Sequence, residues 1–263
     1  MKISETLRLA QYEFSKSQSL TKIHSLSGME QSISDEMRAT VIDWIISLGD
    51  NYRVDNSVIH FTVALLDKFL SSHVIKTRSL QVAGAASFLI ACKHDEQYPP
   101  KLSELVYSID GMTSKSDLLD MEVLMLKTCD YHLRLPTTYN FLSDLVNLLP
   151  KDFGHNSFSF SSYYIEISLL TTASFQFSYS LIAASSLVLA RIILQIDDPW
   201  PKITVMKTNL DILDMYDCIL FVSSLVSAAH EYSPTENVRR KYGHYKYNSV
   251  SKLRHPEYLM LTR

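Results

Sequence analysis

Glycine and proline are scarce in this chain. Its 263 residues include six glycines and eight prolines, whereas an all-β sandwich or barrel needs a turn signal about every 8–12 residues. The glycines lie at positions 28, 49, 84, 111, 154 and 243, never closer than 21 residues apart. A loop that cradles phosphate with its backbone amides needs several glycines close together. The sequence therefore disfavours an all-β fold and excludes the usual nucleotide-binding loops.

Cysteine is also rare, and no apolar run is long. Cys92, Cys129 and Cys218 are odd in number, far apart and without a CxxC pair, which is typical of reduced core residues rather than of a disulfide or zinc framework. The N-terminus lacks the apolar core of a signal peptide. The longest apolar stretch, Leu181 to Leu194, contains Arg191 and is shorter than the roughly 20 residues that span a bilayer. We expect a nuclear or cytoplasmic protein without a membrane partner.

Motifs of catalysis and metal binding are lacking as well. The chain has no HExxH, GxSxG or EF-hand loop. The one metal-like cluster is His94-Asp95-Glu96, but consecutive residues on a helix point in different directions, so a solvated helix end is the favoured interpretation. We expect no cofactor, no metal, no catalytic residue and no enzymatic activity. A catalytic set assembled only in three dimensions stays open.

Helical signals are abundant instead. Ser34 or Ser32 can cap a helix whose first turn carries Asp35 and Glu36, and Gly49 is expected to close it. One apolar stripe follows this helix at i, i+4, i+7 and i+11 and consists of Met37, Val41, Trp44 and Leu48. Further helices are predicted from about Val58 to Ser72, from Ser79 to Lys93, from about Ser103, and from Thr113 or Ser114 to Asp130.

The helix from Ser79 is apolar on nearly all sides and contains the small-residue run AGAAS, which marks the middle of a bundle. Its sequence VAGAASFLIAC, from Val82, aligns with LIAASSLVLAR, from Leu181, at an offset of 99, as in an internal repeat. We therefore predict an all-α chain of two tandem five-helix bundles. The expected divisions are a short N-terminal helix and linker at 1–32, bundles at 33–135 and 136–233, and a basic C-terminal tail at 234–263.

Four segments of the first bundle stand out as motifs. They are MRATVIDWI, from Met37, followed by YRVDNSVIHFTVALLDKFLSS, SLQVAGAASFLIACKHDEQYPP and DMEVLMLKTCDYHLRLPT. The first is similar to the MRxxLxDW signature of the first cyclin box, and all four resemble segments of the cyclin family, in its order and at its spacing. YPP, the PT after the first box and VSKL look most like A/B-type mitotic cyclins, with some E-type features. The resemblance covers residues 33–138 closely and the rest more weakly, and it implies two cyclin boxes.

The resemblance also implies a function. Cyclins are regulatory subunits that bind and activate a cyclin-dependent serine/threonine protein kinase and control cell-cycle progression, mitosis included. The kinase alone holds its αC helix out of place, so that a catalytic lysine lacks its glutamate partner. A bound cyclin shifts the kinase from this inactive conformation towards the active one.

Lys93 and Glu122 match the two charged residues that face the kinase helix in this family. The alternative is an internal salt bridge or a solvated pair. The resemblance adds further kinase-binding positions at Ile90, His94, Leu126, Tyr131 and Tyr12, of which His94 departs from the aromatic or aliphatic residue common in relatives.

A second surface is implied for substrates and inhibitors with Arg-x-Leu motifs. It consists of Met37, Val41, Trp44, Leu48 and Gln81. Taken without the resemblance, a stripe at this spacing is core. Arg38 and Asp43 belong to the same signature and are expected to be structural residues that brace the first box.

Two alternatives stay open, a transcription-type cyclin and a cyclin-fold transcription factor that binds nucleic acid. Binding to DNA requires several phosphate-facing Lys/Arg. The net charge is −3, and from Val238 onward seven Lys/Arg accompany one acid, so that tail carries +6 and the preceding residues −9. The acidic main part of the chain disfavours nucleic acid as a partner.

Overall fold

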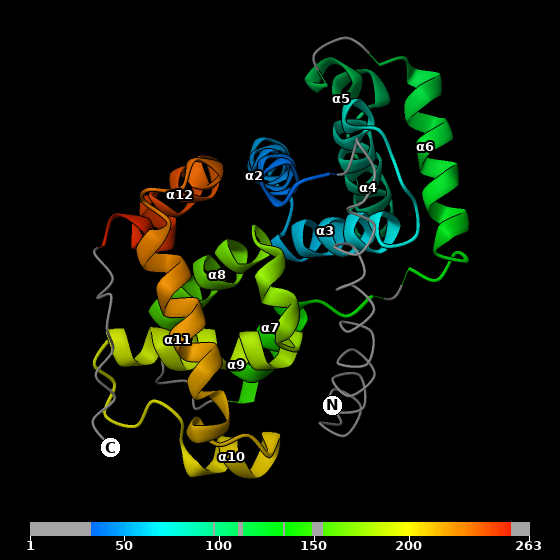
Figure 1. Cartoon of the computed structure of the whole chain (residues 1–263). Coiled ribbons are helices and arrows are strands. Elements are labelled where there is room, and N and C mark those ends of the chain that lie inside the picture. Colours follow the sequence, from blue (N-terminus) through cyan, green and yellow to red (C-terminus); the bar gives the residue numbers. More distant parts are fainter. Residues whose placement is uncertain (1–32, 97, 110–112, 134, 149–154, 254–263) are drawn as a thin grey trace. The chain divides into compact units, whose positions relative to one another are not determined.

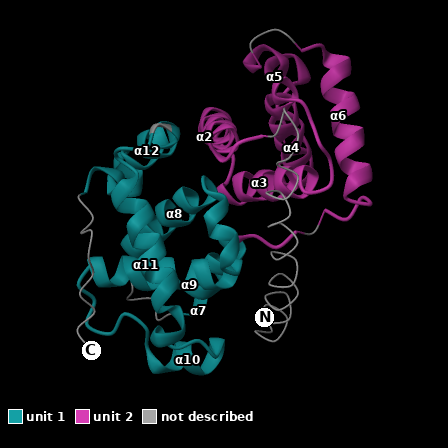
Figure 2. Ribbon diagram, in the orientation of Figure 1, with its two compact units in different colours: residues 1–17, 138–263 teal, residues 18–137 magenta. Residues whose placement is uncertain are grey.

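A computed structural model describes residues 33–253 apart from 97, 110–112, 134 and 149–154. Its described residues contain eleven α-helices, α2 to α12, and no strand (Figure 1). They divide into two compact units, one with residues 33–137 and one with residues 138–253 (Figure 2). The prediction of an all-α chain is confirmed. The position expected to be a kinase contact at Tyr12 lies outside the described residues.

The unit at 33–137 contains the five helices that the sequence predicted. They are α2 (Asp35–Tyr52), α3 (Asn56–Leu70), α4 (Leu80–Asp95), α5 (Leu102–Ser108) and α6 (Lys115–Thr128). Side chains that accept backbone hydrogen bonds set where several of them begin. Ser34 Oγ accepts from the Met37 amide at 3.1 Å, and Asp55 Oδ1 accepts from the Ser57 amide at 2.8 Å, so α3 begins two residues earlier than expected. Ser114 opens α6 in a reciprocal capping box with Asp117.

Gly49 does not close α2, contrary to the expectation. The helix continues to Tyr52 and ends at Arg53, which adopts the left-handed conformation with φ of 57°. A Cβ atom at position 49 would lie 2.6 Å from Cδ1 of Ile59. The glycine is therefore present because α2 approaches α3 closely at this point.

The small-residue helix α4 lies in the middle of its bundle, as predicted. It packs against α2, α3 and α6, and Ala83 to Cys92 are buried without a break. At Gly84 an added Cβ would lie 2.8 Å from Cγ1 of Val41 and 3.3 Å from Cδ1 of Ile45. Small side chains thus allow α2 to pack close to α4.

We expect Gly84→Leu to lower the free energy of unfolding by about 3 kcal/mol, because overpacking a close helix contact typically costs about 1–3 kcal/mol and a branched side chain has no room here. Urea unfolding of the purified chain measures this. Val82→Leu, on the same helix at a half-buried position, is the control and should change stability by less than about 1 kcal/mol. Equal effects of the two variants would contradict the close approach at Gly84.

The unit at 138–253 repeats the arrangement. Its helices are α7 (Thr138–Leu148), α8 (His155–Leu169), α9 (Tyr179–Ile193), α10 (Lys202–Thr208), α11 (Ile212–Ala228) and α12 (Glu236–Tyr242). The first five form the predicted second bundle, and α9, the counterpart of α4, packs against α7, α8 and α11. Residues 182–191 of α9 are all buried.

The segment after 233 folds back onto the second bundle over its described length. Helix α12 and two short 3₁₀ turns, Tyr245–Tyr247 and Val250–Lys252, pack against α8. Lys241 is buried there, and its Nζ lies 2.7 Å from Oε1 of Glu166. Part of the segment expected to be a basic tail therefore belongs to the core of this unit.

The three cysteines are buried free thiols, which confirms them as core residues. Burial raises the pKa of Cys92 and Cys218 to about 12, so both thiols stay protonated at neutral pH. Among the helices described, none has the length and hydropathy that crossing a bilayer requires.

Candidate functional site

The charged pair predicted from the sequence comes together between α4 and α6. Nζ of Lys93 lies 2.7 Å and 2.9 Å from the two carboxylate oxygens of Glu122. Lys93 stands in the last turn of α4, where a cation is favoured by the helix dipole. Its side chain is 46% exposed, whereas that of Glu122 is 10% exposed. The pair is thus an ion pair within one unit whose ammonium group still faces solvent.

The other expected kinase-binding residues surround this pair at different depths. Ile90, one turn before Lys93, is 3% exposed, and Leu126, one turn after Glu122, is half-buried. His94 is exposed, pairs with the adjacent Asp95 and meets the ring of Phe61 edge-on at 5.3 Å between centroids. Leu126 and His94 therefore have side-chain surface open to solvent beside the ion pair, whereas Ile90 is a core residue.

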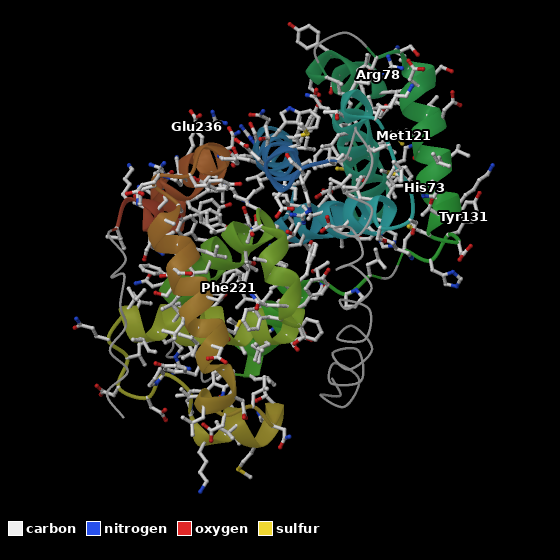
Figure 3. All side chains as sticks on the ribbon, viewed as in Figure 1. His73, Arg78, Met121, Tyr131, Phe221 and Glu236 are labelled. Atoms are coloured by element: carbon white, nitrogen blue, oxygen red, sulfur yellow. The ribbon has the colours of Figure 1, made fainter. Side chains whose placement is uncertain are left out.

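Tyr131 extends from the C-terminal end of α6 and is 64% exposed (Figure 3). Both Asp130 and Tyr131 have positive φ, 49° and 57°, a conformation that costs an ordinary residue about 1–2 kcal/mol. The Tyr131 amide donates to the carbonyl of Leu126 at 2.9 Å and so closes the helix. An exposed aromatic side chain held on a strained turn is typical of a binding position.

Apolar residues that sequence reasoning did not single out widen this surface. Leu119, Val123 and Leu124 of α6 are 41%, 46% and 40% exposed. Their signal in the sequence is an apolar run, DLLDMEVLML, with too many apolar residues for one buried stripe. Leu119, Val123 and Leu126, at i, i+4 and i+7, share the side of α6 that carries Glu122, whereas Leu124 lies on another side. With Tyr131 they form an apolar outer side next to the ion pair, which is unusual for a helix that has water as its only neighbour.

Four of the residues proposed for substrate docking form a stripe on α2 that faces partly outward, and the fifth, Gln81, lies in the first turn of α4. Met37 is 40% exposed, and Val41, Trp44 and Gln81 are half-buried. Leu48 is 3% exposed and belongs to the core. The side chains of Val41 and Trp44 also lie beside Gly84 of α4, so the stripe is core on one side and surface on the other.

Arg38 joins α2 to α3 through a buried bidentate ion pair with Asp67. Its Nε donates to Oδ1 and its Nη2 to Oδ2, both at 2.7 Å, and the two side chains are 3% and 4% exposed. Two parallel charge-assisted hydrogen bonds hold the helices in one register. Asp43 is buried as well, at 4%. Asp67 was missed in the sequence, although an acid inside the apolar run LLDKFL is the signal of such a pair.

The described part of the chain contains no ready metal site. No group of three His, Cys, Asp or Glu side chains there has a metal-binding arrangement. In the His94-Asp95-Glu96 cluster, His94 pairs with Asp95, while the Glu96 carboxylate accepts from the amide of Asp55 at 3.3 Å. The three side chains therefore make separate local contacts and do not converge on one point where a metal ion could bind.

Comparison with known proteins identifies the family of this chain. Residues 8–134 match the family model described as "Cyclin, N-terminal domain", and residues 136–256 match "Cyclin, C-terminal domain". Cyclin-A2 of Bos taurus is 32% identical over 231 residues, 88% of this chain and 53% of the bovine protein. The G2/mitotic-specific cyclin-A of Patella vulgata is 30% identical over 236 residues, 89% of this chain and 54% of that protein. The chain therefore spans about half the length of these relatives.

Two solved structures share the fold. A viral cyclin from herpesvirus saimiri superposes with a TM-score of 0.66 at 22% identity and covers 74% of this chain and 86% of its own. A chain of the CAK complex from Chaetomium thermophilum bound to ATP-gamma-S gives a TM-score of 0.51 at 15% identity, with 95% and 84% covered. These likenesses show the fold, and the two domain models, which match nearly the whole sequence, show that the chain belongs to the cyclin family.

Proposed function

We propose that this protein is the regulatory subunit of a cyclin-dependent serine/threonine kinase and acts in the cell cycle. The observation that carries the proposal is the half-exposed Lys93–Glu122 ion pair beside the apolar outer side of α6. Membership of the cyclin family and the names of its relatives, one of them a mitotic cyclin, support it. The protein would then have no catalytic site of its own and would work in the nucleus or cytoplasm.

The proposed mechanism is a shift of conformational populations. The apolar residues of α6 would bury the kinase αC helix, and Tyr131 would contact a neighbouring loop. Lys93 Nζ would donate to backbone carbonyls at the end of a kinase helix, which have no partner inside that helix. The kinase binds in its active arrangement because only that arrangement presents these groups together.

The test of the proposal is kinase activation. A panel of purified cyclin-dependent kinases is assayed on a peptide substrate with and without the chain, and the mixtures are analysed by gel filtration. We expect one kinase to co-elute and to gain orders of magnitude in activity, because an inactive αC position removes a catalytic ion pair. The chain alone should transfer no phosphate. Co-elution with DNA but with no kinase would instead support a cyclin-fold nucleic-acid binder.

We further propose that the α2 stripe, together with Gln81 of α4, recruits substrates and inhibitors through Arg-x-Leu motifs. Met37 is exposed, and Val41, Trp44 and Gln81 are half-buried. An aromatic anchor such as Trp44 often dominates a small interface. Leu48 would form the floor beneath them.

Trp44→Ala should leave activity on a short peptide unchanged and weaken phosphorylation of an Arg-x-Leu protein about tenfold, a difference of about 1.4 kcal/mol. Because Trp44 also packs beside Gly84, Trp44→Ala can also disturb the fold. The double variant Met37→Ala/Gln81→Ala should disturb the fold less and show the same selectivity. Equal loss on both substrates, with a lower melting temperature, would assign the stripe to the core.

A further inference from the structure

Helix α11 has apolar residues on two opposite faces. One face packs on α8 and α9 and buries Met215, Cys218, Ile219, Val222 and Val226. The opposite face carries Leu213, Tyr216 and Leu220, which are 82%, 41% and 37% exposed. Their spacing of i, i+3 and i+7 places them in one stripe. A surface helix normally turns polar residues to water on that side, so the stripe is unexplained by the fold.

Carboxylates border this stripe along one edge. Asp214 and Asp217 are exposed on α11, and no described residue forms an ion pair with either of them. Asp214 accepts from the Asp211 amide at 3.1 Å in a capping box, which leaves its negative charge in place. From residue 197 to 220 the chain has five Asp against two Lys. The stripe therefore lies in a region of negative potential.

The stripe is also held on a rigid element. The capping box defines the first turn of α11, and the ring of Phe221, labelled in Figure 3, packs against Phe177 at 5.2 Å between centroids. A preformed surface loses little conformational entropy on binding, which favours affinity.

We propose that this outer face of α11 docks a basic amphipathic helix of a partner protein. The apolar side of such a helix would cover Leu213, Tyr216 and Leu220, and its Lys or Arg residues would lie opposite Asp214 and Asp217. An anionic membrane surface does not fit, because it would meet like charge. This face belongs to the unit that carries none of the described residues proposed to contact the kinase, so both partners can be tested separately.

The test is a selection of peptides that bind the whole chain. A display library of helical peptides of roughly 15 residues, about four turns, is panned on the wild-type protein and counter-selected on Leu213→Ser/Leu220→Ser. We expect enriched peptides with Lys or Arg next to apolar residues at i, i+3 or i+4, and i+7. Their synthetic forms should bind the double variant about tenfold or more weakly. Asp217→Lys should also weaken peptide binding, and the binding that remains should depend less on salt concentration.

Leu253→Ser, an exposed apolar position in the same unit, is the control and should bind as wild type does. Leu213 is 82% exposed and Leu220 37% exposed, so the melting temperature of the double variant should fall by no more than a few degrees and report intact folding. Peptides without net positive charge, or unchanged binding by the double variant, would overturn the proposal. So would a wild-type dimer in light scattering that the double variant abolishes, because the face would then be an interface between two copies of this chain.

Discussion

Replacing Lys93 by alanine is expected to weaken binding to the cognate kinase by roughly 30-fold or more, since truncating one partner of a desolvated charged contact typically costs about 2–5 kcal/mol. The ammonium group is the exposed member of its ion pair and the one that can reach a partner. Calorimetry with the kinase identified in the activation panel measures the effect. Lys76→Ala, at an exposed position of the same unit, is the matched control and should bind normally.

The ion pair within the chain complicates this test, because Lys93→Ala also leaves Glu122 nearly buried without its cation. The exchange Lys93→Glu/Glu122→Lys separates the two roles. It restores an internal ion pair and should recover most of the thermal stability lost in Lys93→Ala. The polarity presented to the kinase is reversed, so binding should stay weak. An exchange variant that binds the kinase as wild type does would show that the pair only braces α4 against α6.

Replacing Lys241 by methionine should destabilise the unit at 138–253 by about 3–5 kcal/mol, the usual effect of leaving a buried charge without its partner. The side chains of Lys241 and Glu166 are 3% and 0% exposed. Oε1 of Glu166 accepts from both Lys241 Nζ and the Tyr242 hydroxyl, each at 2.7 Å. Burial and this carboxylate hold the pKa of Tyr242 well above its ordinary value, so the phenol stays protonated and donates.

Urea unfolding and amide hydrogen exchange check this expectation, and the second method shows whether α12 opens alone. Glu166→Gln/Lys241→Met should regain much of the lost stability, because neutral groups replace a buried ion pair at little cost and glutamine still accepts from Tyr242. Lys246→Met, at an exposed position of the same segment, should change stability by less than about 0.5 kcal/mol. If Lys241→Met also changed stability by so little, the folding of α12 would not depend on the Lys241–Glu166 ion pair.

Local patterns in the sequence determined the helices and their order. The capping residues Ser34 and Ser114 act within a few residues of themselves. The small-residue run of α4 and its counterpart in α9 also identified the two central helices, because a helix apolar on all sides has to be buried. Helix periodicity, caps and breaks are local, so they can be read without knowing what the chain packs against.

Residues far apart in sequence were paired only by the tertiary structure. Arg38 pairs with Asp67 and Lys93 pairs with Glu122, in both cases 29 residues apart in sequence. Lys241 pairs with Glu166, which lies 75 residues away in sequence. The resemblance to cyclins placed Lys93 and Glu122 on one surface, but which acid serves Arg38 or Lys241 depends on how the helices cross. Crossing angles follow from the side chains of both helices together, which no single segment specifies.

Burial of individual residues was likewise a tertiary outcome. Gly49 was expected to end α2, but it lies inside this helix, where it approaches Ile59 of α3 closely. Leu48 belongs to an apparently uniform stripe, yet it is 3% exposed while Met37 is 40% exposed. Arg191 is completely buried in α9, where its Nη2 donates to the carbonyl of Asp198 at 2.8 Å. The sequence states which side chains are apolar or charged; only packing decides which of them meet water, because each helix face is covered by residues distant in the chain.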